Sequence, residues 1–296
     1  MSYTQDQIRN IVLAGHSGSG KTTLAEALLY RTGGSDRLGR VEEGNTVSDY
    51  DPDEIKRRAS MQASMIPVDY TGVRLNFIDV PGLFDFELGL YEAMPAVESA
   101  LICVSARDGL QVGAGKAYRL AEKYGKSKMF YISEVDVENA DFYKVFEDLK
   151  AEYGPSVCPV VVPYIQDGQA NTYVNLFDYK AYKYDGKGNA TPTALPDMGD
   201  RLEGLREAIK EAVAETDEEL MDRFFEGDDF TYAEMINGLH QGVKDLSLFP
   251  VLCGSGMTCL GSLMLMDQII DLLPNPIEGN YHKATTADGT VEEFIV

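Results

Sequence analysis

Short apolar runs alternate with stretches of helical spacing along the first half of the chain. A run such as residues 101–106 (LICVSA) is almost wholly apolar, which is typical of a strand buried on both faces. Such runs predict strands at residues 8–14, 74–80, 101–106 and 129–133, and the spacing between them predicts helices at 24–33, 91–99, 116–124 and 140–153. This alternation predicts an α/β fold in which helices cover both faces of a mostly parallel sheet.

The segment between the first helix and the second strand lacks such a pattern. Residues 34–66 are polar, irregular and rich in Asp, Arg and Ser. A stretch of this length without periodicity is typical of a functional or mobile loop. We therefore expect a long loop here.

The pattern changes again after residue 156. Residues 158–165 and 172–184 alternate as strands do, and residues 199–241 are acidic with helical spacing. Residues 248–253 then return to an apolar strand, and residues 261–273 predict a closing helix. We predict a domain over residues 1–276 with an α+β subdomain inserted at about 156–245. Residues 277–296 predict a linker and a strand at 290–296 with nothing visible to pair with, so we expect a fragment of a longer protein.

Composition and charge exclude several classes of protein. Hydrophobic residues make up 44%, which is ordinary globular composition. The net charge of −22 disfavours binding of bare nucleic acid or an anionic membrane. No apolar run approaches the roughly 18 residues of a membrane span, and the N-terminus lacks a signal-peptide stretch. The cysteines lie without metal-ligand spacing and predict buried thiols of a cytoplasmic protein: Cys103, Cys158, Cys253 and Cys259.

A phosphate-binding motif stands between the first strand and the first helix. The sequence GHSGSGKT (residues 15–22) fits G-x-x-x-x-G-K-[ST]. Small residues let successive backbone N–H groups converge on phosphates at the positive end of a helix dipole. The lysine supplies charge to the β and γ oxygens, and the hydroxyl after it suits Mg²⁺. The predicted nucleotide contacts are His16, Ser17, Gly18, Ser19, Gly20, Lys21, Thr22 and Thr23.

A second motif, DVPG, closes the strand at residues 74–80. Asp79 at a strand end is placed to hold the Mg²⁺ shell, and the N–H of Gly82 to bond a γ-phosphate. D-x-P-G alone is also a common turn, but its combination with a phosphate loop is typical of GTPases. We therefore predict catalytic roles for Lys21, Asp79 and Gly82.

With these motifs in hand, the sequence resembles the translational GTPases, in particular elongation factor G and its paralogues. The resemblance covers nearly the whole chain. It is carried by GHSGSGKTT and IDVPGLFDF, and by the longer stretches VENADFYKVFEDLK, EAVAETDEELMDRFFEG, FPVLCGSGMTCLG and IIDLLPNP. It implies a G domain with an inserted subdomain, followed after residue 276 by the start of a β-barrel domain.

The same resemblance implies ligands and partners. It implies GTP or GDP with Mg²⁺, and a cytoplasmic, monomeric protein that acts on the ribosome through rRNA and stalk proteins, mostly by domains absent here. The implied metal ligands are Thr22, Asp79 and Ser60, which stands where the family has a switch threonine. Ser64 is a competing candidate for that position.

The chain departs from the family in its catalytic motif. Leu83 stands where the family has the histidine that positions the attacking water. The side chain of leucine can neither donate nor accept a hydrogen bond. We expect hydrolysis slower by about 10²-fold or more unless another residue substitutes.

The base-recognition loops depart as well. Ser133, Glu134 and Asp136 stand where the family has N-K-x-D, so we expect Asp136 to accept from guanine while affinity and specificity fall. The loop that contains Ser255 and Gly256 departs only mildly, because a glycine still offers a backbone N–H to the guanine oxygen.

Three functions remain open at this point. The first is a GTP-hydrolysing switch. The second is a degenerate ribosome-associated protein without turnover, favoured by Leu83 and Glu134. The third is a P-loop ATPase with relaxed base choice, which competition between guanine and adenine nucleotides would distinguish from the first two.

Overall fold

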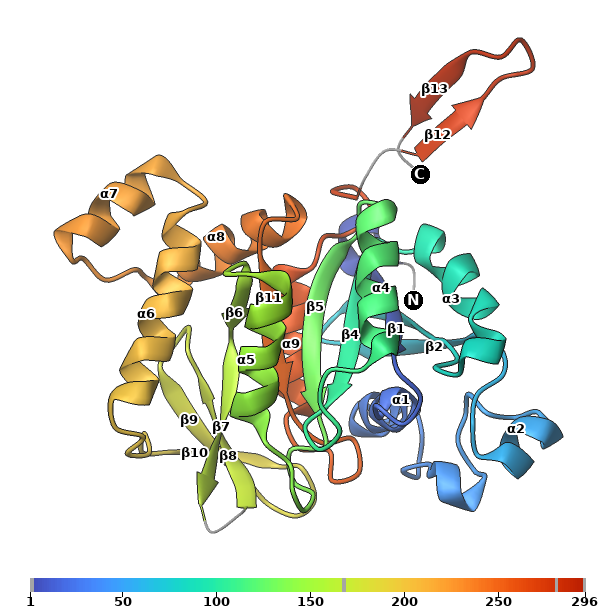
Figure 1. Ribbon diagram of the computed structural model, residues 1–296, viewed down its shortest axis with the longest axis horizontal. Coiled ribbons are helices and arrows are strands. Elements are labelled where there is room, and N and C mark those ends of the chain that lie inside the picture. Colours follow the sequence, from blue (N-terminus) through green and yellow to red (C-terminus); the bar gives the residue numbers. More distant parts are fainter. Residues whose placement is uncertain (1–2, 167–168, 280–281, 295–296) are drawn as a thin grey trace.

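A seven-stranded sheet forms the centre of the molecule (Figure 1). The structure is a computed structural model that describes residues 3–166, 169–279 and 282–294. The strand order is β2-β3-β1-β4-β5-β11-β6, and only β2 runs antiparallel to its neighbour. The strands are β1 (Ile8–Gly15), β2 (Ser64–Tyr70), β3 (Val73–Asp79), β4 (Ser99–Ser105), β5 (Ser127–Ser133), β6 (Val157–Pro159) and β11 (Phe249–Cys253).

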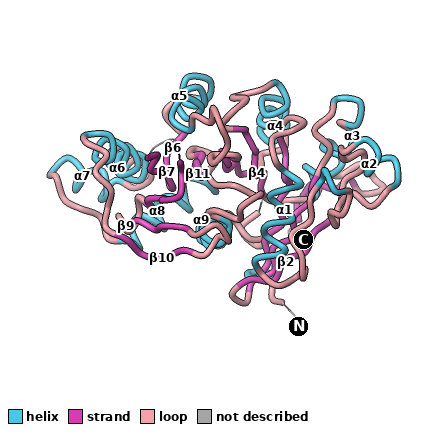
Figure 2. Tube along the Cα trace, turned by 90° about the horizontal axis from the view of Figure 1, so that it is seen from below, coloured by secondary structure: helices cyan, strands magenta, loops and turns pink. Residues whose placement is uncertain are grey.

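Helices cover both faces of this sheet, as the sequence pattern predicted (Figure 2). One face carries α1 (Lys21–Arg31), which packs against α9 (Ser262–Leu272). The other carries α3 (Leu88–Ala93), α4 (Val112–Lys123) and α5 (Phe142–Tyr153). Every residue of β4 and β5 is buried because both of their faces are covered. The remaining short elements are α2 (Pro52–Arg57) and the 3₁₀ turns at Gln5–Gln7, Val41–Glu43, Phe84–Phe86 and Met94–Ala96.

The chain leaves the main sheet between β6 and β11 to form a second unit. This unit has an antiparallel sheet in the order β10-β9-β8-β7, followed by three helices. Its elements are β7 (Val161–Gln166), β8 (Gln169–Asn175), β9 (Lys180–Tyr184), β10 (Ala190–Thr193), α6 (Asp200–Ala214), α7 (Glu218–Glu226) and α8 (Tyr232–Lys244). The single strands expected at 158–165 and 172–184 are each two strands, because the chain breaks at Val160 and turns at residues 176–179.

Two further expectations from the sequence are wrong. Residues 34–66 are not wholly irregular, since they contain α2 and the start of β2, an edge strand whose buried residues alternate around Pro67. The strand expected at 290–296 does pair: β13 (Val291–Phe294) lies antiparallel to β12 (His282–Thr285). Residues 295–296 of that expectation lie outside the described part of the chain.

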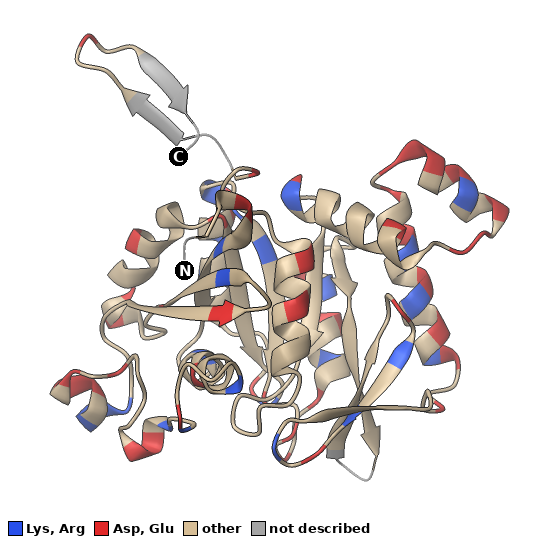
Figure 3. Ribbon diagram, turned by 180° about the vertical axis from the view of Figure 1, so that it is seen from behind, with Lys and Arg blue, Asp and Glu red and all other residues tan. Residues whose placement is uncertain are grey.

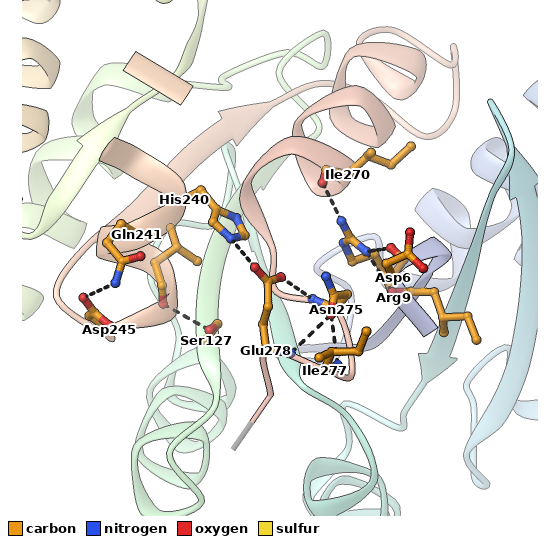
Figure 4. A network of polar contacts seen from close by, with 12 residues as sticks. Asp6, Arg9, Ser127, His240, Gln241, Asp245, Ile270, Asn275, Ile277 and Glu278 are labelled. Atoms are coloured by element: carbon orange, nitrogen blue, oxygen red, sulfur yellow. Dashed lines mark hydrogen bonds and ion pairs between the residues drawn. The ribbon is translucent and has the colours of Figure 1, made fainter. Parts of the chain in front are cut away.

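A polar network joins the second unit to the chain that follows α9 (Figure 4). The Nε2 atom of His240 on α8 lies 3.0 Å from the carboxylate of Glu278, which also accepts from the backbone N–H of Asn275. Nearby, the buried guanidinium of Arg9 donates to the carbonyls of Asp6 and Ile270. These contacts hold the exit from α9 against both α8 and the start of β1.

The described residues also test the predictions made above about the cysteines and about membrane-spanning segments. All four cysteines are buried and free, as predicted. No helix in the described ranges is both long and apolar enough to cross a lipid bilayer.

Candidate functional site

The loop from β1 to α1 has the backbone that a phosphate cradle requires. Gly18 and Gly20 adopt φ of +81° and +77°, the left-handed region that glycine enters without strain. Gly15 approaches the neighbouring strand so closely that a Cβ there would lie 2.4 Å from the carbonyl oxygen of Cys103. The motif residues therefore place the first turn of α1 with its N–H groups directed toward the loop.

Lys21 lies inside this loop with its ammonium group directed at loop carbonyls. Its Nζ donates to the carbonyl of His16 at 2.8 Å and to that of Gly15 at 3.3 Å. Burial lowers the pKa of Lys21, while the nearby Asp79 carboxylate opposes this change. The ammonium group therefore lies inside the loop that the sequence predicts to bind phosphate.

Asp79, at the end of β3, meets the hydroxyl of Thr22. The Thr22 hydroxyl donates to Asp79 Oδ2 at 2.7 Å. Asp79 Oδ1 is buried and has no hydrogen-bond partner among the described residues. Burial raises the pKa of Asp79 to about 6, against the opposing effects of the Thr22 hydroxyl and the Lys21 charge. An unpartnered carboxylate oxygen beside a hydroxyl is the donor type that Mg²⁺ prefers.

The two candidates for the switch residue differ in the contacts of their hydroxyl groups. The Ser60 hydroxyl lies 3.3 Å from that of Thr22 and donates to Asp49 Oδ1 at 2.7 Å. Ser64 instead begins β2, and its hydroxyl donates to the carbonyl of Ser48 at 2.9 Å. Ser60 therefore lies beside Thr22, whereas Ser64 pairs with Asp79 across β2 and β3 but directs its hydroxyl to Ser48.

Several residues that sequence reasoning missed hold the loop before β2. Asp49 is only 4% exposed, and burial raises its pKa. Buried Glu26 accepts from the backbone N–H of Gly39, and buried Glu54 from that of Met61. The sequence does not reveal these roles, because no local spacing marks a contact between a carboxylate and a distant backbone N–H.

The loop after β3 lies directly against the phosphate loop. A Cβ at Gly82 would lie 2.5 Å from Lys21 Nζ and 2.6 Å from the backbone nitrogen of Ser17. Leu83 follows it, and both line a cavity of about 210 Å³. Other predicted residues on the wall of this cavity are Ser17, Gly18, Gly20, Lys21, Thr22, Thr23 and Ser60.

The base-recognition residues lie at the ends of β5 and β11. The Ser133 hydroxyl donates to the carbonyl of Ser19, so it braces the phosphate loop. Glu134, at φ +58°, accepts from the Ser105 hydroxyl and lines the cavity. Asp136 accepts from Thr258 at 2.6 Å, and its Oδ1 is buried without a partner in the described ranges. Thr258 is another residue that sequence reasoning missed.

The last predicted loop offers one backbone donor rather than two. The N–H of Ser255 donates to the carbonyl of Leu260 at 3.0 Å. Gly256 packs on the first turn of α1, where a Cβ would lie 2.6 Å from the carbonyl oxygen of Thr23. Its N–H makes no hydrogen bond to any described residue. Gly256 thus keeps an unengaged backbone N–H against the first turn of α1, whereas the N–H of Ser255 is already engaged.

The fold and this site define a P-loop nucleotide-binding protein. The model of the elongation factor Tu GTP-binding domain matches residues 6–275, and the chain belongs to this family of GTP-binding domains. The chain is also similar to the crystal structure of ttk003000868 from Thermus thermophilus, at 35% sequence identity and a TM-score of 0.87. That match covers 95% of this chain and 43% of the other, so the chain spans less than half of the length of that protein.

Proposed function

We propose that this chain is the GTP-binding domain of an elongation factor G-like translation factor, a Mg²⁺-dependent GTPase switch with slow intrinsic hydrolysis. The observation that carries the proposal is a cluster in which Lys21, Thr22 and Ser60 line one cavity and the Thr22 hydroxyl donates to Asp79. Three separate segments contribute to it: the phosphate loop, the loop before β2 and the end of β3. The longer elongation factor G-like stretches of the sequence support the finer assignment.

Each residue of the cluster has a role in this proposal. Lys21 and the loop N–H groups bind the β- and γ-phosphates, and Gly82 senses the γ-phosphate through its backbone. Thr22, Ser60 and Asp79 hold Mg²⁺, which neutralises charge on the phosphate oxygens.

The base is read on the other side of the loop. Asp136 accepts from guanine, and Thr258 fixes its carboxylate through the 2.6 Å hydrogen bond. Adenine lacks the donor pair that Asp136 accepts from, so the site favours guanine. Gly256 supplies a backbone N–H to the guanine oxygen.

A specific observation favours a second candidate, a ribosome-associated protein that binds nucleotide without turnover. Leu83 lines the cavity beside Gly82 and offers neither a donor nor an acceptor for an attacking water. The two candidates share the nucleotide site and differ only in hydrolysis.

We propose further that the whole protein acts in the cytoplasm on the ribosome and that this part is monomeric. The family and the resemblance support this proposal. The net charge of −22 suits it only if other parts of the protein make most of the RNA contacts.

The first test is titration of the purified chain with fluorescent GDP and GTP analogues in Mg²⁺, with ATP as competitor. We expect guanine-specific binding in the micromolar range that Lys21→Ala abolishes and Lys144→Ala, an exposed control on α5, preserves. Absence of saturable binding up to millimolar nucleotide would overturn both candidates. Single-turnover hydrolysis with and without ribosomes then separates them.

A further inference from the structure

A second cavity, of about 430 Å³, lies away from the nucleotide site. It lies among α8, α9, the β8–β10 sheet and the turn between β2 and β3. Figure 2 shows β9, β10, α8 and α9 gathered on one side of the main sheet. None of the residues assigned above to nucleotide or Mg²⁺ lines it. Its volume lies in the range of small-molecule sites.

The walls of this cavity combine carboxylates with aromatic rings. Asp267 and Asp271 stand one turn apart on α9, and Asp178 reaches the cavity from the turn before β9. The wall also contains tyrosine rings and an apolar strip: Tyr182, Tyr184, Tyr232, Leu263, Met264 and Ile270. No Lys, Arg or His is among the described residues that line it. Carboxylates together with tyrosine faces are the surroundings that organic cations favour.

The carboxylates are not all neutralised by the protein itself. Asp178 pairs with Lys180 at 3.3 Å. The single hydrogen bond that Asp267 accepts from a described residue comes from the hydroxyl of Tyr70 at 2.9 Å. Asp271 makes no hydrogen bond or ion pair within the described ranges, although the charge of Arg9 acts on it. Burial raises the pKa of both Asp267 and Asp271, and the proximity of Asp267 raises that of Asp271 further. A cation between them would relieve both effects.

A buried amide on the same wall provides a second and independent indication of a ligand. Gln268 lines the cavity, is only 2% exposed, and its Oε1 has no partner among the residues that the structure describes. Leaving such a buried group unpaired is unfavourable, and a ligand with N–H groups would satisfy it.

The arrangement favours an extended cation over a metal ion. No group of three His, Cys, Asp or Glu side chains in the described ranges is placed to hold a metal. Asp267 and Asp271 lie about 6 Å apart along α9 by helix geometry, and Asp178 lies on a different element. We propose that this cavity binds a linear aliphatic di- or polyamine, with its ammonium groups on these carboxylates and its methylene chain on the tyrosines.

Calorimetric titration of the chain with 1,4-diaminobutane and spermidine in 150 mM NaCl tests this proposal. We expect saturable one-to-one binding with a Kd below about 1 mM. Asp267→Asn/Asp271→Asn should weaken it at least about 10-fold. The matched control, Asp222→Asn/Glu226→Gln, removes the same charge from exposed positions of α7 and should leave it unchanged.

A second variant keeps the test decisive if the double variant fails to fold. Ala190 is exposed at the cavity wall, so Ala190→Lys adds an ammonium group without removing a core residue. We expect it to abolish amine binding while guanine-nucleotide binding stays unchanged, which separates this proposal from the proposed function. Two results would overturn the proposal by showing that the amine acts only through charge screening. One is an equal loss of amine binding in the α7 control, and the other is displacement of the amine by Mg²⁺ at the same concentration of charge.

Discussion

At the scale of single residues, Asp79 shows a conflict between stability and binding. Its carboxylate is buried with one oxygen unpartnered, and its pKa is raised from 3.8 to about 6. The folded protein therefore binds an extra proton between these pH values. The contribution of Asp79 to folding grows more unfavourable as pH rises through this window, to about 3 kcal/mol above pH 7. Such a cost is typical of a group kept for a ligand.

The first prediction follows from this conflict. Without nucleotide or Mg²⁺, Asp79→Asn should raise the free energy of unfolding, because the variant no longer buries a charge. The gain should be about 1–3 kcal/mol at pH 8 and smaller by about 1 kcal/mol at pH 5. Urea denaturation at both pH values measures it, with exposed Asp85→Asn as control. A gain that does not vary with pH would contradict the assigned cause.

The second prediction concerns Leu83, which lines the cavity beside Gly82. Leu83→His restores a group that can orient water, so single-turnover hydrolysis should rise by at least about 10-fold. Affinity for GDP should change little, because the substitution adds no contact to the base or to the first two phosphates. Leu83→Met is the apolar control. An unchanged rate for the histidine variant on the ribosome would show that water positioning does not limit turnover.

At the scale of elements, the loop between α1 and β2 is held by buried acids rather than by regular structure. Glu54 is 1% exposed. It accepts from the backbone N–H groups of Met61 and Gln62 with one oxygen, and from that of Asp51 with the other. A carboxylate can receive donors on both oxygens, whereas an amide can receive them on only one. The position of Ser60 therefore depends on the carboxylate of Glu54, six residues before it.

The third prediction tests that dependence. Glu54→Gln should place an N–H₂ group against backbone donors and loosen the segment that carries Ser60. Affinity for a GTP analogue in Mg²⁺ should fall about 5- to 10-fold, while affinity for GDP should hardly change. Nucleotide titration measures both affinities. The control is Glu92→Gln, at an exposed position of α3. An equal loss for the two nucleotides would mean that the loop supports the fold rather than the γ-phosphate side of the site.

The strands and loops also differ in how far the sequence alone predicts them. The strands β1, β4 and β5 were predictable because burial on both faces leaves a run of apolar residues. Strand β2 was missed because an edge strand buries only alternate residues, here Ile66 and Val68 around Pro67. The phosphate loop was found from its local spacing. Thr258 was missed because it meets Asp136 across 122 positions, and only the fold brings them together.

At the scale of the whole molecule, the main feature is the excess of acidic over basic residues. The chain has 48 acidic and 26 basic residues, and acidic residues crowd on α7 and near α2, at opposite sides of the view in Figure 3. Several ion pairs link these charges on the surface, such as Arg74–Asp69 and Lys116–Glu87. Exposed pairs contribute little each, about 0–1 kcal/mol. We therefore expect self-repulsion among the excess carboxylates to outweigh these pairs in the folded state.

The last prediction follows from that balance. Salt shortens the range of repulsion, with a Debye length of about 20 Å at 0.02 M and about 6 Å at 0.3 M. The free energy of unfolding at pH 8 should thus rise by about 1 kcal/mol between 20 and 300 mM NaCl, where surface ion pairs alone would make it fall. Urea midpoints at the two concentrations measure it. Chloride is the right anion, because sulfate also strengthens apolar burial and is attracted to the helix end at the phosphate loop, so that its stabilisation would have three causes.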